Sequence, residues 1–517
     1  MTFGYPEDSR PTTVTESPRD DVLRLSIMAG RWQFLNTAVQ QVLSMGTFLV
    51  LARILAPTDF GVAALIMTAP NFLDGITTFS FDVAALQKKD RMRDYLNVVW
   101  TFNICRAALI FLVATATAPF IAHFFHIEYA LPLLYLAGIG ILVQSFFNIG
   151  QNFLFLTLDL KKIFYRDIAF KVGYAAAAIP LAFLLHSYLA LFLATIVSII
   201  CVTAATYVIH PYRPHFDFAF GKLYDLRHAG QWLYAQEIAG QFERTIGDGM
   251  IGRFATPTDL GLFSKAKSLA AAVISPLISN INKVSFSSYL HVRDSLPHIS
   301  EGISKTFDIL FAFGLPYVLV IILTGRRLVL IVLGPNWVDL TPYLKVLVIS
   351  ATLNALSVIL ASAVFNGIGK PRTQFAISAI STGSILTGFL VLVPLFGIWG
   401  AVYATLLGSV IATAATIYFM LIHVPLNWPR IITSLLITII ACITPIPLAI
   451  YLLSLPFFNT TVGYLFLLAV GGTLYAGIIA AAGIILRKGP YDTFVLLAQT
   501  ILGSILPRIR AFSRSAT

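Results

Sequence analysis

The chain has 517 residues, of which 57% are hydrophobic and only 11% are charged. A soluble globular protein carries about 25% charged residues, so this composition excludes a chain whose main solvent is water. The formal net charge of +11 could suit a nucleic-acid-binding protein, and the distribution of the charge has to decide that question.

Apolar stretches of a membrane-spanning length recur along the chain. A helix of about 20 apolar residues crosses the roughly 30 Å hydrocarbon core of a bilayer. Polar or Pro/Gly-containing breaks divide the sequence into about 14 such stretches. We therefore predict an all-α polytopic membrane protein whose spans start near residues 32, 61, 97, 131, 165, 188, 231, 261, 304, 342, 374, 397, 431 and 463.

The two ends of the chain are polar or basic. Residues 1–27 contain three prolines and lack the apolar core and cleavage site of a secretory signal, so we expect a disordered tail and an uncleaved first span. Most Lys and Arg residues lie in this tail, in alternate loops and in the C-terminal tail. The positive-inside rule then places both termini in the cytoplasm, and topology explains the net charge better than nucleic acid does.

The C-terminal segment 487–517 is predicted to be a cytoplasmic tail. Within it, residues 490–506 are apolar but too short to span, and Arg508, Arg510 and Arg514 follow. This pattern suits a helix lying on an anionic inner leaflet, and a solvated tail is the alternative.

Residues 30–61 and 230–261 align without a gap at an offset of 200. Eight positions are identical to their partners in the second copy: Gly30, Trp32, Gln41, Arg53, Pro57, Thr58, Asp59 and Gly61. We interpret this as an internal duplication. The copies begin at spans one and seven, so both enter the membrane in the same direction, and parallel repeats of this kind place a substrate site between two halves.

The duplication divides the chain into an N-lobe (28–210), a linker (211–230) and a C-lobe (231–425), with two further spans in 426–486. Each copy of the repeat contains a Pro-Thr-Asp motif at the start of its second span. We expect Thr58 or Asp59, and Thr258 or Asp259, to cap the exposed amides at these helix N-termini.

Span seven has a polar face. Glu237, Gln241, Arg244 and Asp248 follow i, i+4, i+7, i+11 spacing, which places them on one side of a helix. Each charge in mid-membrane costs at least about 2.5 kcal/mol, so this face lines a hydrated cavity or its charges pair with one another. The equivalent face of span one is polar but uncharged.

Spans two and eight complete the predicted cavity. Span two contributes Asp74, and span eight contributes Lys265 and Lys267 beside a row of serines. The alternative is that the charges only hold helices together, and for Arg106 of span three and Asp74 we expect such a pair.

No enzyme chemistry, cofactor or metal site is predicted. The three cysteines lie singly in apolar spans, and the outer loops show no paired carboxylates or metal-ligand spacing.

Five segments carry a resemblance to a known family. They are LARILAPTDFGVAAL (51–65), AALQKKD (84–90), DGMIGRFATPTDLGLFSKAKSL (248–269), LGPNW (333–337) and FNGIGKPRTQF (365–375). In their order and spacing the chain resembles the polysaccharide transporters, Wzx-like lipid-linked oligosaccharide flippases of the multidrug/oligosaccharidyl-lipid/polysaccharide exporter superfamily.

The resemblance implies two six-helix lobes forming a V, two added C-terminal helices and a bacterial inner membrane. It also implies alternating-access translocation of undecaprenyl-diphosphate-linked repeat units for lipopolysaccharide, capsule or exopolysaccharide. Polysaccharide polymerases and glycosyltransferases would be partners.

On this reading several polar groups in the membrane have expected roles, while Lys171 and Asp308 have none. Arg244, Lys265 and Lys267 would bind the diphosphate, and the sugars would be held by amides, namely Gln33, Asn36, Gln40, Gln41 and Gln241. Glu237, Asp248 and Asp74 would bind the H+ or Na+ that drives the empty carrier back. The net acidic character of span seven would instead suit a cation-coupled multidrug exporter of the same superfamily, which is the alternative function.

Overall fold

The computed structural model describes residues 18–79, 81, 92–156, 159–276, 278, 296–368, 370–453 and 460–486. Over this part of the chain every regular element is a helix. The long helices are α1 (Pro18–Ile54), α2 (Pro57–Thr77), α4 (Met92–Phe125), α8 (Leu160–Leu185), α9 (Tyr188–Ile209), α10 (Arg227–Phe254), α11 (Pro257–Ala272), α13 (Leu296–Val332), α14 (Thr341–Leu360), α15 (Pro371–Phe396), α16 (Ile398–His423), α17 (Trp428–Ile443) and α19 (Thr461–Leu486). Shorter ones are α5 (Leu131–Leu136), α6 (Ile139–Ser145), α7 (Asn152–Leu156) and α18 (Ile446–Leu453), the 3-10 helices η2 (Glu128–Ala130), η3 (Ile149–Gln151), η4 (Phe220–Leu226) and η5 (Pro335–Leu340), and the π-helix η6 (Ala361–Phe365).

The predicted membrane spans coincide with helices. Within the described residues, 11 helices are long and apolar enough to cross a bilayer. The other three predicted spans are α10, which is too polar, α11, which has 16 residues, and α19, whose apolar part is Phe466–Ile479. The all-α polytopic fold is confirmed, and the count of fourteen stays a prediction.

Helix α1 begins earlier than the sequence suggested. It has 37 residues from Pro18, so the last part of the segment expected to be disordered is helical. Proline suits the first helical turn, because the missing N–H has no partner there in any case. Residues 1–17, and the predicted C-terminal tail 487–517, lie outside the described residues.

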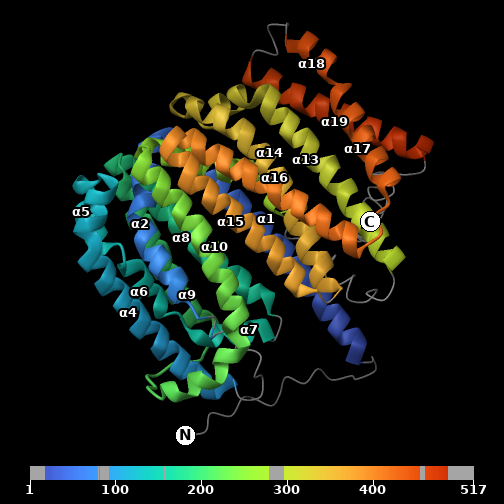
Figure 1. Ribbon diagram of the computed structural model, residues 1–517. Helices are drawn as coiled ribbons and strands as arrows, with labels where there is room; N and C mark the ends of the chain where they lie inside the picture. The colour runs from blue at the N-terminus through green and yellow to red at the C-terminus, as the bar shows by residue number, and fades with distance from the viewer. Residues whose placement is uncertain are drawn as a thin grey trace, which may run out of the picture.

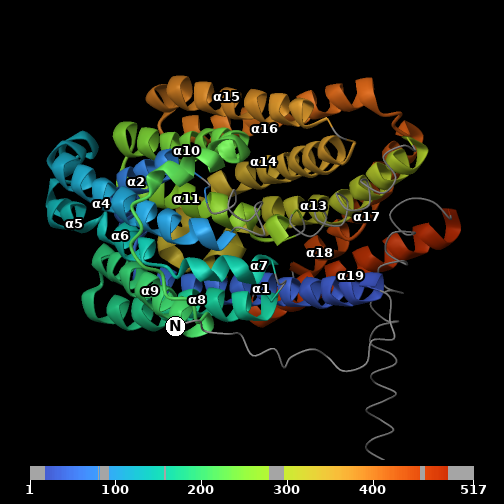
Figure 2. The same cartoon turned by 90° about the horizontal axis from the view of Figure 1, so that it is seen from below.

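The packing repeats itself. We call α1, α2 and α4–α9 the first helix set, and α10, α11 and α13–α16 the second. In the first set α1 packs along α8 and α8 along α9; in the second α10 packs along α15 and α15 along α16. The sets meet where α2 packs against α11 and α10 against α2. In Figure 2 the first set lies on the side of α8 and α9, and α15 and α16 lie on the opposite side.

The remaining C-terminal helices attach to the second set. Helices α17, α18 and α19 lie together at the edge beyond α13 in Figure 1, and α17 packs on both α13 and α19. A buried ion pair contributes to this contact, since Arg430 Nη2 of α17 donates to Asp308 Oδ2 of α13 at 3.1 Å, with Asp308 fully buried. These helices extend the second set at its edge.

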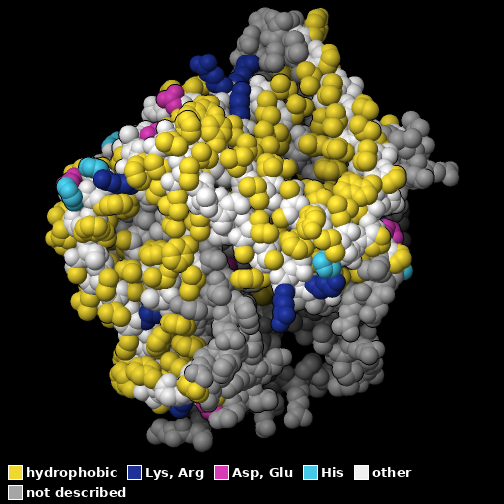
Figure 3. Space-filling model, viewed as in Figure 1, with side chains coloured by type: hydrophobic (Ala, Val, Ile, Leu, Met, Phe, Trp, Pro, Cys, Tyr) yellow, Lys and Arg dark blue, Asp and Glu magenta, His cyan; other side chains and the backbone are white. Residues whose placement is uncertain are grey.

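The outer surface is apolar. Hydrophobic side chains cover most of the face in Figure 3, and large residues such as Phe120, Leu184 and Val208 are exposed. Such a surface would be unstable in water and is what a bilayer requires. The protein is a multi-pass membrane protein.

The segment between the sets is held against α4. Tyr212 donates its hydroxyl to Asn97 Oδ1 at 2.8 Å, and the Asp217 amide donates to the Thr101 hydroxyl at 2.9 Å. The Lys222 ammonium donates to Asp217 at 2.9 Å and lowers the pKa of that carboxyl. The predicted linker 211–230 therefore packs on the first set, and its last residues already belong to α10.

Candidate functional site

The two copies of the Pro-Thr-Asp motif touch each other. Thr58 Oγ1 and Thr258 Oγ1 are 2.7 Å apart. A Cβ placed on Gly61 would overlap the Pro257 carbonyl, and one placed on Gly261 would overlap the Pro57 carbonyl. Only glycine permits this approach of α2 and α11. We call this end of the molecule the outer end, following the predicted topology.

Of the two capping residues expected at each helix start, the aspartate takes part in the cap in both copies. Asp59 Oδ2 accepts from the Ala56 amide and Asp259 Oδ2 from the Thr256 amide, both at 3.0 Å. Thr256 also caps α11 by accepting from the Asp259 amide at 3.1 Å. The aspartate, at the third helical position, accepts a hydrogen bond from the amide of the residue just before the helix. Thr58 and Thr258 are therefore available for contact between the sets.

A cavity of about 210 Å³ lies further in from the outer end; the first helix set forms most of its lining and Lys265 of the second set completes it. It holds two lysines, Lys171 of α8 and Lys265 of α11, with aromatic walls and hydroxyl groups. Its lining is Leu43, Ser44, Thr47, Phe48, Leu51, Phe60, Phe170, Lys171, Tyr174, Thr195 and Lys265. We call it the lysine cavity.

No carboxylate is among the described residues that line the lysine cavity. Lys265 Nζ lies 4.6 Å from the ring centroid of Phe60 and 5.0 Å from that of Phe48, and Lys171 Nζ lies 5.7 Å from that of Phe170. The face of an aromatic ring stabilises a lysine ammonium only weakly, whereas a bound anion stabilises it strongly. The cavity is therefore suited to an anionic ligand. Of the three residues predicted to bind the diphosphate, Lys265 lines this cavity.

The amides predicted to hold sugars form a network in the first set. Asp167 Oδ2 accepts from Asn36 Nδ2 at 2.8 Å and from Gln40 Nε2 at 3.1 Å, while Asp167 Oδ1 accepts from Arg166 at 2.6 Å. Gln40 also donates to Asn36 Oδ1 at 2.9 Å. Asn36 is thereby engaged through both its amide nitrogen and its oxygen, whereas Gln40 also lines a cavity of about 500 Å³.

The two residues matched by the repeat, Gln41 and Gln241, both bridge the sets. Gln41 Nε2 donates to the Ala272 carbonyl at 3.4 Å, and Gln241 Nε2 donates to the Asn71 carbonyl at 2.9 Å. Arg244 is exposed and donates to Gln241 Oε1 at 3.1 Å. Neither Gln241 nor Arg244 lines the lysine cavity.

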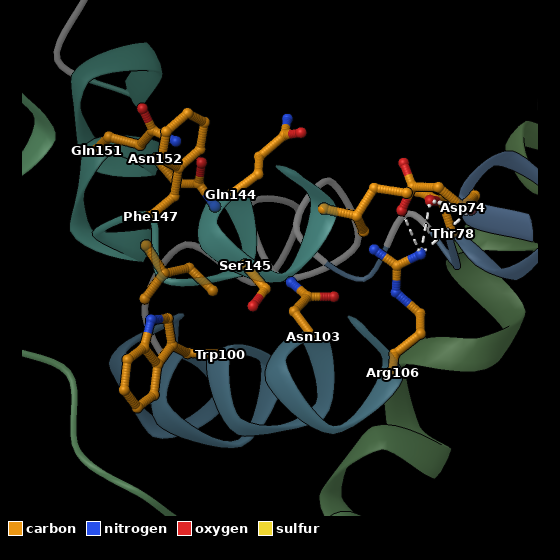
Figure 4. A pocket seen from close by; sticks show the side chains of 12 residues that line it. Asp74, Thr78, Trp100, Asn103, Arg106, Gln144, Ser145, Phe147, Gln151 and Asn152 are labelled. Carbon is orange, nitrogen blue, oxygen red and sulfur yellow. Dashed lines mark hydrogen bonds and ion pairs between the residues drawn. The ribbon is translucent and has the colours of Figure 1, made fainter. Parts of the chain in front are cut away.

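The expected pair of Asp74 and Arg106 forms. Arg106 Nη1 lies 2.7 Å from Asp74 Oδ1 and also donates to the hydroxyls of Thr77 and Thr78, each at 3.1 Å. Figure 4 shows this pair at one end of a cavity of about 200 Å³. A carboxylate bound in this way is already neutralised, which weakens the expected ion-coupling role of Asp74.

The acidic residues of α10 do not form one cluster with the lysine cavity. Glu243 Oε2 accepts from Thr382 of α15 at 3.2 Å, and Asp248 lies near Lys267, which is exposed. The side chain of Glu237 lies outside the described residues. Asp248 and Lys267 stay candidates for ion coupling and for substrate binding, respectively.

Sequence reasoning gave no role to Lys171, Arg166 and Asp167. All three lie on α8, where Asp167 and Lys171 are four residues apart within an apolar span. Charges at helical spacing within an apolar span indicate a polar face and could have identified these residues. The cavity was instead predicted from the duplicated segment, and α8 lies outside it.

The helices and cavities together define a class of protein, a polytopic membrane transporter with two similar helix sets and polar cavities among its helices. A family model described as "Polysaccharide biosynthesis protein" matches residues 50–342, more than half of the chain. The chain belongs to this family.

Relatives agree with this assignment. The chain is 23% identical to the teichuronic acid biosynthesis protein TuaB of Bacillus subtilis (strain 168), over 70% of this chain and 78% of that protein. It is 22% identical to the succinoglycan biosynthesis transport protein ExoT of Rhizobium meliloti (strain 1021), over 62% and 65%, and 20% identical to the lipopolysaccharide biosynthesis protein WzxC of Escherichia coli (strain K12), over 64% and 68%.

Solved structures show the same fold. The chain is similar to the lipid II flippase MurJ in an inward closed conformation, with a TM-score of 0.71 and 11% identity over 88% of this chain and 99% of that one. It is also similar to an inward-facing MATE-family multidrug transporter, with a TM-score of 0.55 and 15% identity over 76% and 95%. These neighbours are transporters rather than enzymes.

Proposed function

We propose that this protein is a flippase for undecaprenyl-diphosphate-linked oligosaccharide repeat units in the bacterial inner membrane. The product would serve lipopolysaccharide, capsule or exopolysaccharide biosynthesis, with glycosyltransferases before it and a polymerase after it. The names of TuaB, ExoT and WzxC, which refer to polysaccharide biosynthesis or transport, support this assignment. The Lys/Arg distribution supports cytoplasmic termini.

The lysine cavity is the observation that carries the proposal. A diphosphate needs cations, and Lys171 and Lys265 supply two ammonium groups without a lining carboxylate among the described residues. Ser44 and Thr47 add hydroxyl donors. Because Lys171 belongs to the first helix set and Lys265 to the second, a bound diphosphate would join the sets.

Alternating access is the proposed mechanism. Contact of Thr58 with Thr258, and of the paired glycines with the opposite prolines, would hold the outer end closed. Separation of these contacts would open the lysine cavity to the outer side, and closure of the inner ends would follow. Asp248 would bind the H+ or Na+ that favours the return of the empty carrier.

The test is transport by purified protein in vesicles. A fluorescent polyprenyl-diphosphate oligosaccharide is placed in one leaflet, and its appearance in the other is followed for the native chain, Lys171→Ala, Lys265→Ala and the double variant. Lys161→Ala, at the exposed start of α8, is the matched control. We expect at least about a tenfold loss for each cavity variant, the equivalent of one lost charge-assisted contact of about 1.4 kcal/mol, and the native rate for the control.

Two other outcomes would change the assignment of the anion site or of the function. Arg244→Ala and Lys267→Ala, the other predicted diphosphate contacts, are measured beside them, and a larger loss there would move the anion site toward α10. If no lipid moves but organic cations exchange for protons, the multidrug-exporter alternative is correct and the acidic residues of α10 are its site.

A further inference from the structure

A second polar interior lies inside the first helix set. Two adjoining cavities, of about 500 and about 200 Å³, share Gln144 and Phe147. We call them together the amide cavity. Their combined lining is Gln40, Asp74, Thr78, Trp100, Asn103, Arg106, Ile141, Gln144, Ser145, Phe147, Ile149, Gln151, Asn152, Arg166, Asp167, Phe170, Ile199 and Val202.

Several donors of the amide cavity lack partners within the described residues. Trp100 Nε1, Asn152 Nδ2 and Arg106 Nε are buried and make no hydrogen bond there. Trp100 and Asn152 are only 6% and 7% exposed. A buried donor without a partner costs about 1–3 kcal/mol, but these nitrogens expose almost no surface to the cavity, so a ligand oxygen would reach them only if the side chains turned toward it.

Two amides face the same space. Figure 4 shows Gln144, Asn103 and Ser145 between Trp100 at one end and Arg106 at the other. An amide offers both a donor and an acceptor, so Gln144 and Asn103 can each bond a hydroxyl group in either direction.

The amide cavity has no net charge, unlike the lysine cavity. Each of its arginines is held by a carboxylate: Arg106 lies 2.7 Å from Asp74, and Arg166 lies 2.6 Å from Asp167. A free anion would meet cations that are already paired. The aromatic side chains of Trp100, Phe147 and Phe170 complete the walls, a mixture of ring faces and amides that fits an uncharged sugar ring, with its apolar C–H face and its rim of hydroxyls.

The two cavities adjoin at one residue. Phe170 lines both the lysine cavity and the amide cavity, and its neighbours on α8 divide between them, with Lys171 on one side and Asp167 on the other. A ligand whose diphosphate is bonded directly to a sugar would extend from one cavity into the next.

We propose that the amide cavity is a glycan subsite that binds the uncharged sugar residues nearest the diphosphate. This rests on the proposed function for the position of the diphosphate, while the lining chemistry supports the sugar class by itself. The cavity lies toward the ends of α2, α4 and α8 remote from the outer end, so the glycan would enter from the predicted cytoplasmic side.

The experiment compares two lipids that differ only in the sugar. Binding of a polyprenyl diphosphate bearing a neutral disaccharide, and of the same lipid without sugar, is measured with the purified full chain, Gln144→Leu and Asn103→Leu. Gln374→Leu, whose amide on α15 contacts Ser378, is the matched control. We expect each cavity variant to bind the glycosylated lipid roughly tenfold more weakly, because an amide–hydroxyl contact is lost, and the sugar-free lipid normally.

A third ligand separates this proposal from the proposed function. Binding of the free neutral disaccharide is measured with the same variants, and thermal unfolding reports whether each is folded. If neither lipid binds but the disaccharide binds in a Gln144-dependent way, the glycan subsite stands and the diphosphate role fails. Equal loss of both lipids, or no loss of any ligand in folded variants, would overturn the subsite and leave a cavity that holds only water.

Discussion

The two copies of the duplicated segment are alike at the outer end and different further in. At the outer end, Thr58 meets Thr258 and each glycine meets the opposite proline. The arginines match as well: Arg53 donates to the Ile331 carbonyl near the end of α13, and Arg253 donates to the Phe124 carbonyl near the end of α4. Each arginine reaches the third long helix of the other set.

Further in, the copies have diverged. The inner part of α1 carries neutral amides, with Asn36 and Gln40 bonded to Asp167 inside its own set. Helix α10 carries Glu243, Arg244 and Asp248 where α1 has Leu43, Ser44 and Phe48, and Glu243 contacts α15. The contact that joins the sets has stayed symmetric, whereas the groups available to a ligand or an ion have become specialised. On the proposed function, this contrast would assign closure to one region and selectivity to the other.

A cross-link across the symmetric contact has the largest expected effect. In a chain whose three cysteines are replaced by alanine, Thr58→Cys combined with Thr258→Cys should form a disulfide, because the two hydroxyl oxygens are 2.7 Å apart. Oxidation should abolish vesicle transport, and a reductant should restore it.

The single variants Thr58→Cys and Thr258→Cys, treated with the same oxidant, control for chemical damage. Native transport by the cross-linked protein would mean that the outer end does not have to open, and would remove alternating access through this contact.

Glycine replacement should be the next largest effect, and it tests the symmetry. Gly61→Ala and Gly261→Ala each direct a methyl group into a backbone carbonyl, and overpacking costs about 1–3 kcal/mol. In the chain that carries both threonine-to-cysteine changes, we expect each to slow disulfide cross-linking between positions 58 and 258 roughly tenfold, since about 1.4 kcal/mol corresponds to tenfold.

Gly249→Ala on α10 is the control, because a Cβ there meets open space. Cross-linking at the native rate in either contact variant would show that α2 and α11 approach less closely in the membrane. Unequal effects of the two would show that the closure is not symmetric.

The diverged part of α10 is tested by replacing Asp248, with Asp74 of α2 as the comparison. Asp248→Asn should remove any stimulation of transport by a proton or sodium gradient, a severalfold loss, while leaving the protein stable. Asp74→Asn should keep that stimulation and instead lower thermal stability by about 1–3 kcal/mol, because Arg106 loses its partner at a site where the carboxylate is 35% exposed. Transport with and without each gradient, beside thermal unfolding, checks both. The reverse pattern would make Asp74 the coupling residue.

Much of the fold could be predicted from the sequence, because apolar stretches of about twenty residues in a bilayer satisfy their backbone groups only as helices. The pair of Asp74 and Arg106 was predictable for a similar reason: opposite charges at similar depth in adjacent spans tend to pair. The duplication was detectable because its motif fixes backbone geometry, with Gly61 and Gly261 at a contact that admits no side chain.

The site was only partly predictable. Lys265 was found because it belongs to a duplicated helix, but its partner Lys171 comes from α8, and no local pattern states which spans will face each other. The sequence left open whether Thr58 or Asp59, and Thr258 or Asp259, forms each cap, because both residue types are good caps. The structure shows the aspartates in the caps and the threonines in the contact between the sets. The buried donors of the amide cavity arise from the arrangement of α4, α6, η3 and α7, which no single segment encodes.

The arginines at the outer end should have the smallest effect, and an informative one. Each donates to a carbonyl at the exposed rim, and we expect such a hydrogen bond to stabilise the contact by about 0.5–1 kcal/mol. Arg53→Ala should therefore slow cross-linking of positions 58 and 258 by about two- to fivefold. Arg253→Ala should have the larger effect, because its guanidinium also lies 5.1 Å from the Phe124 ring centroid and this stacking contributes separately. Phe124→Leu removes the ring but not the carbonyl, and should bring the two arginines level. If Arg53→Ala and Arg253→Ala are already equal in the presence of Phe124, the stacking does not contribute and the rim is as symmetric in energy as the motif is in sequence.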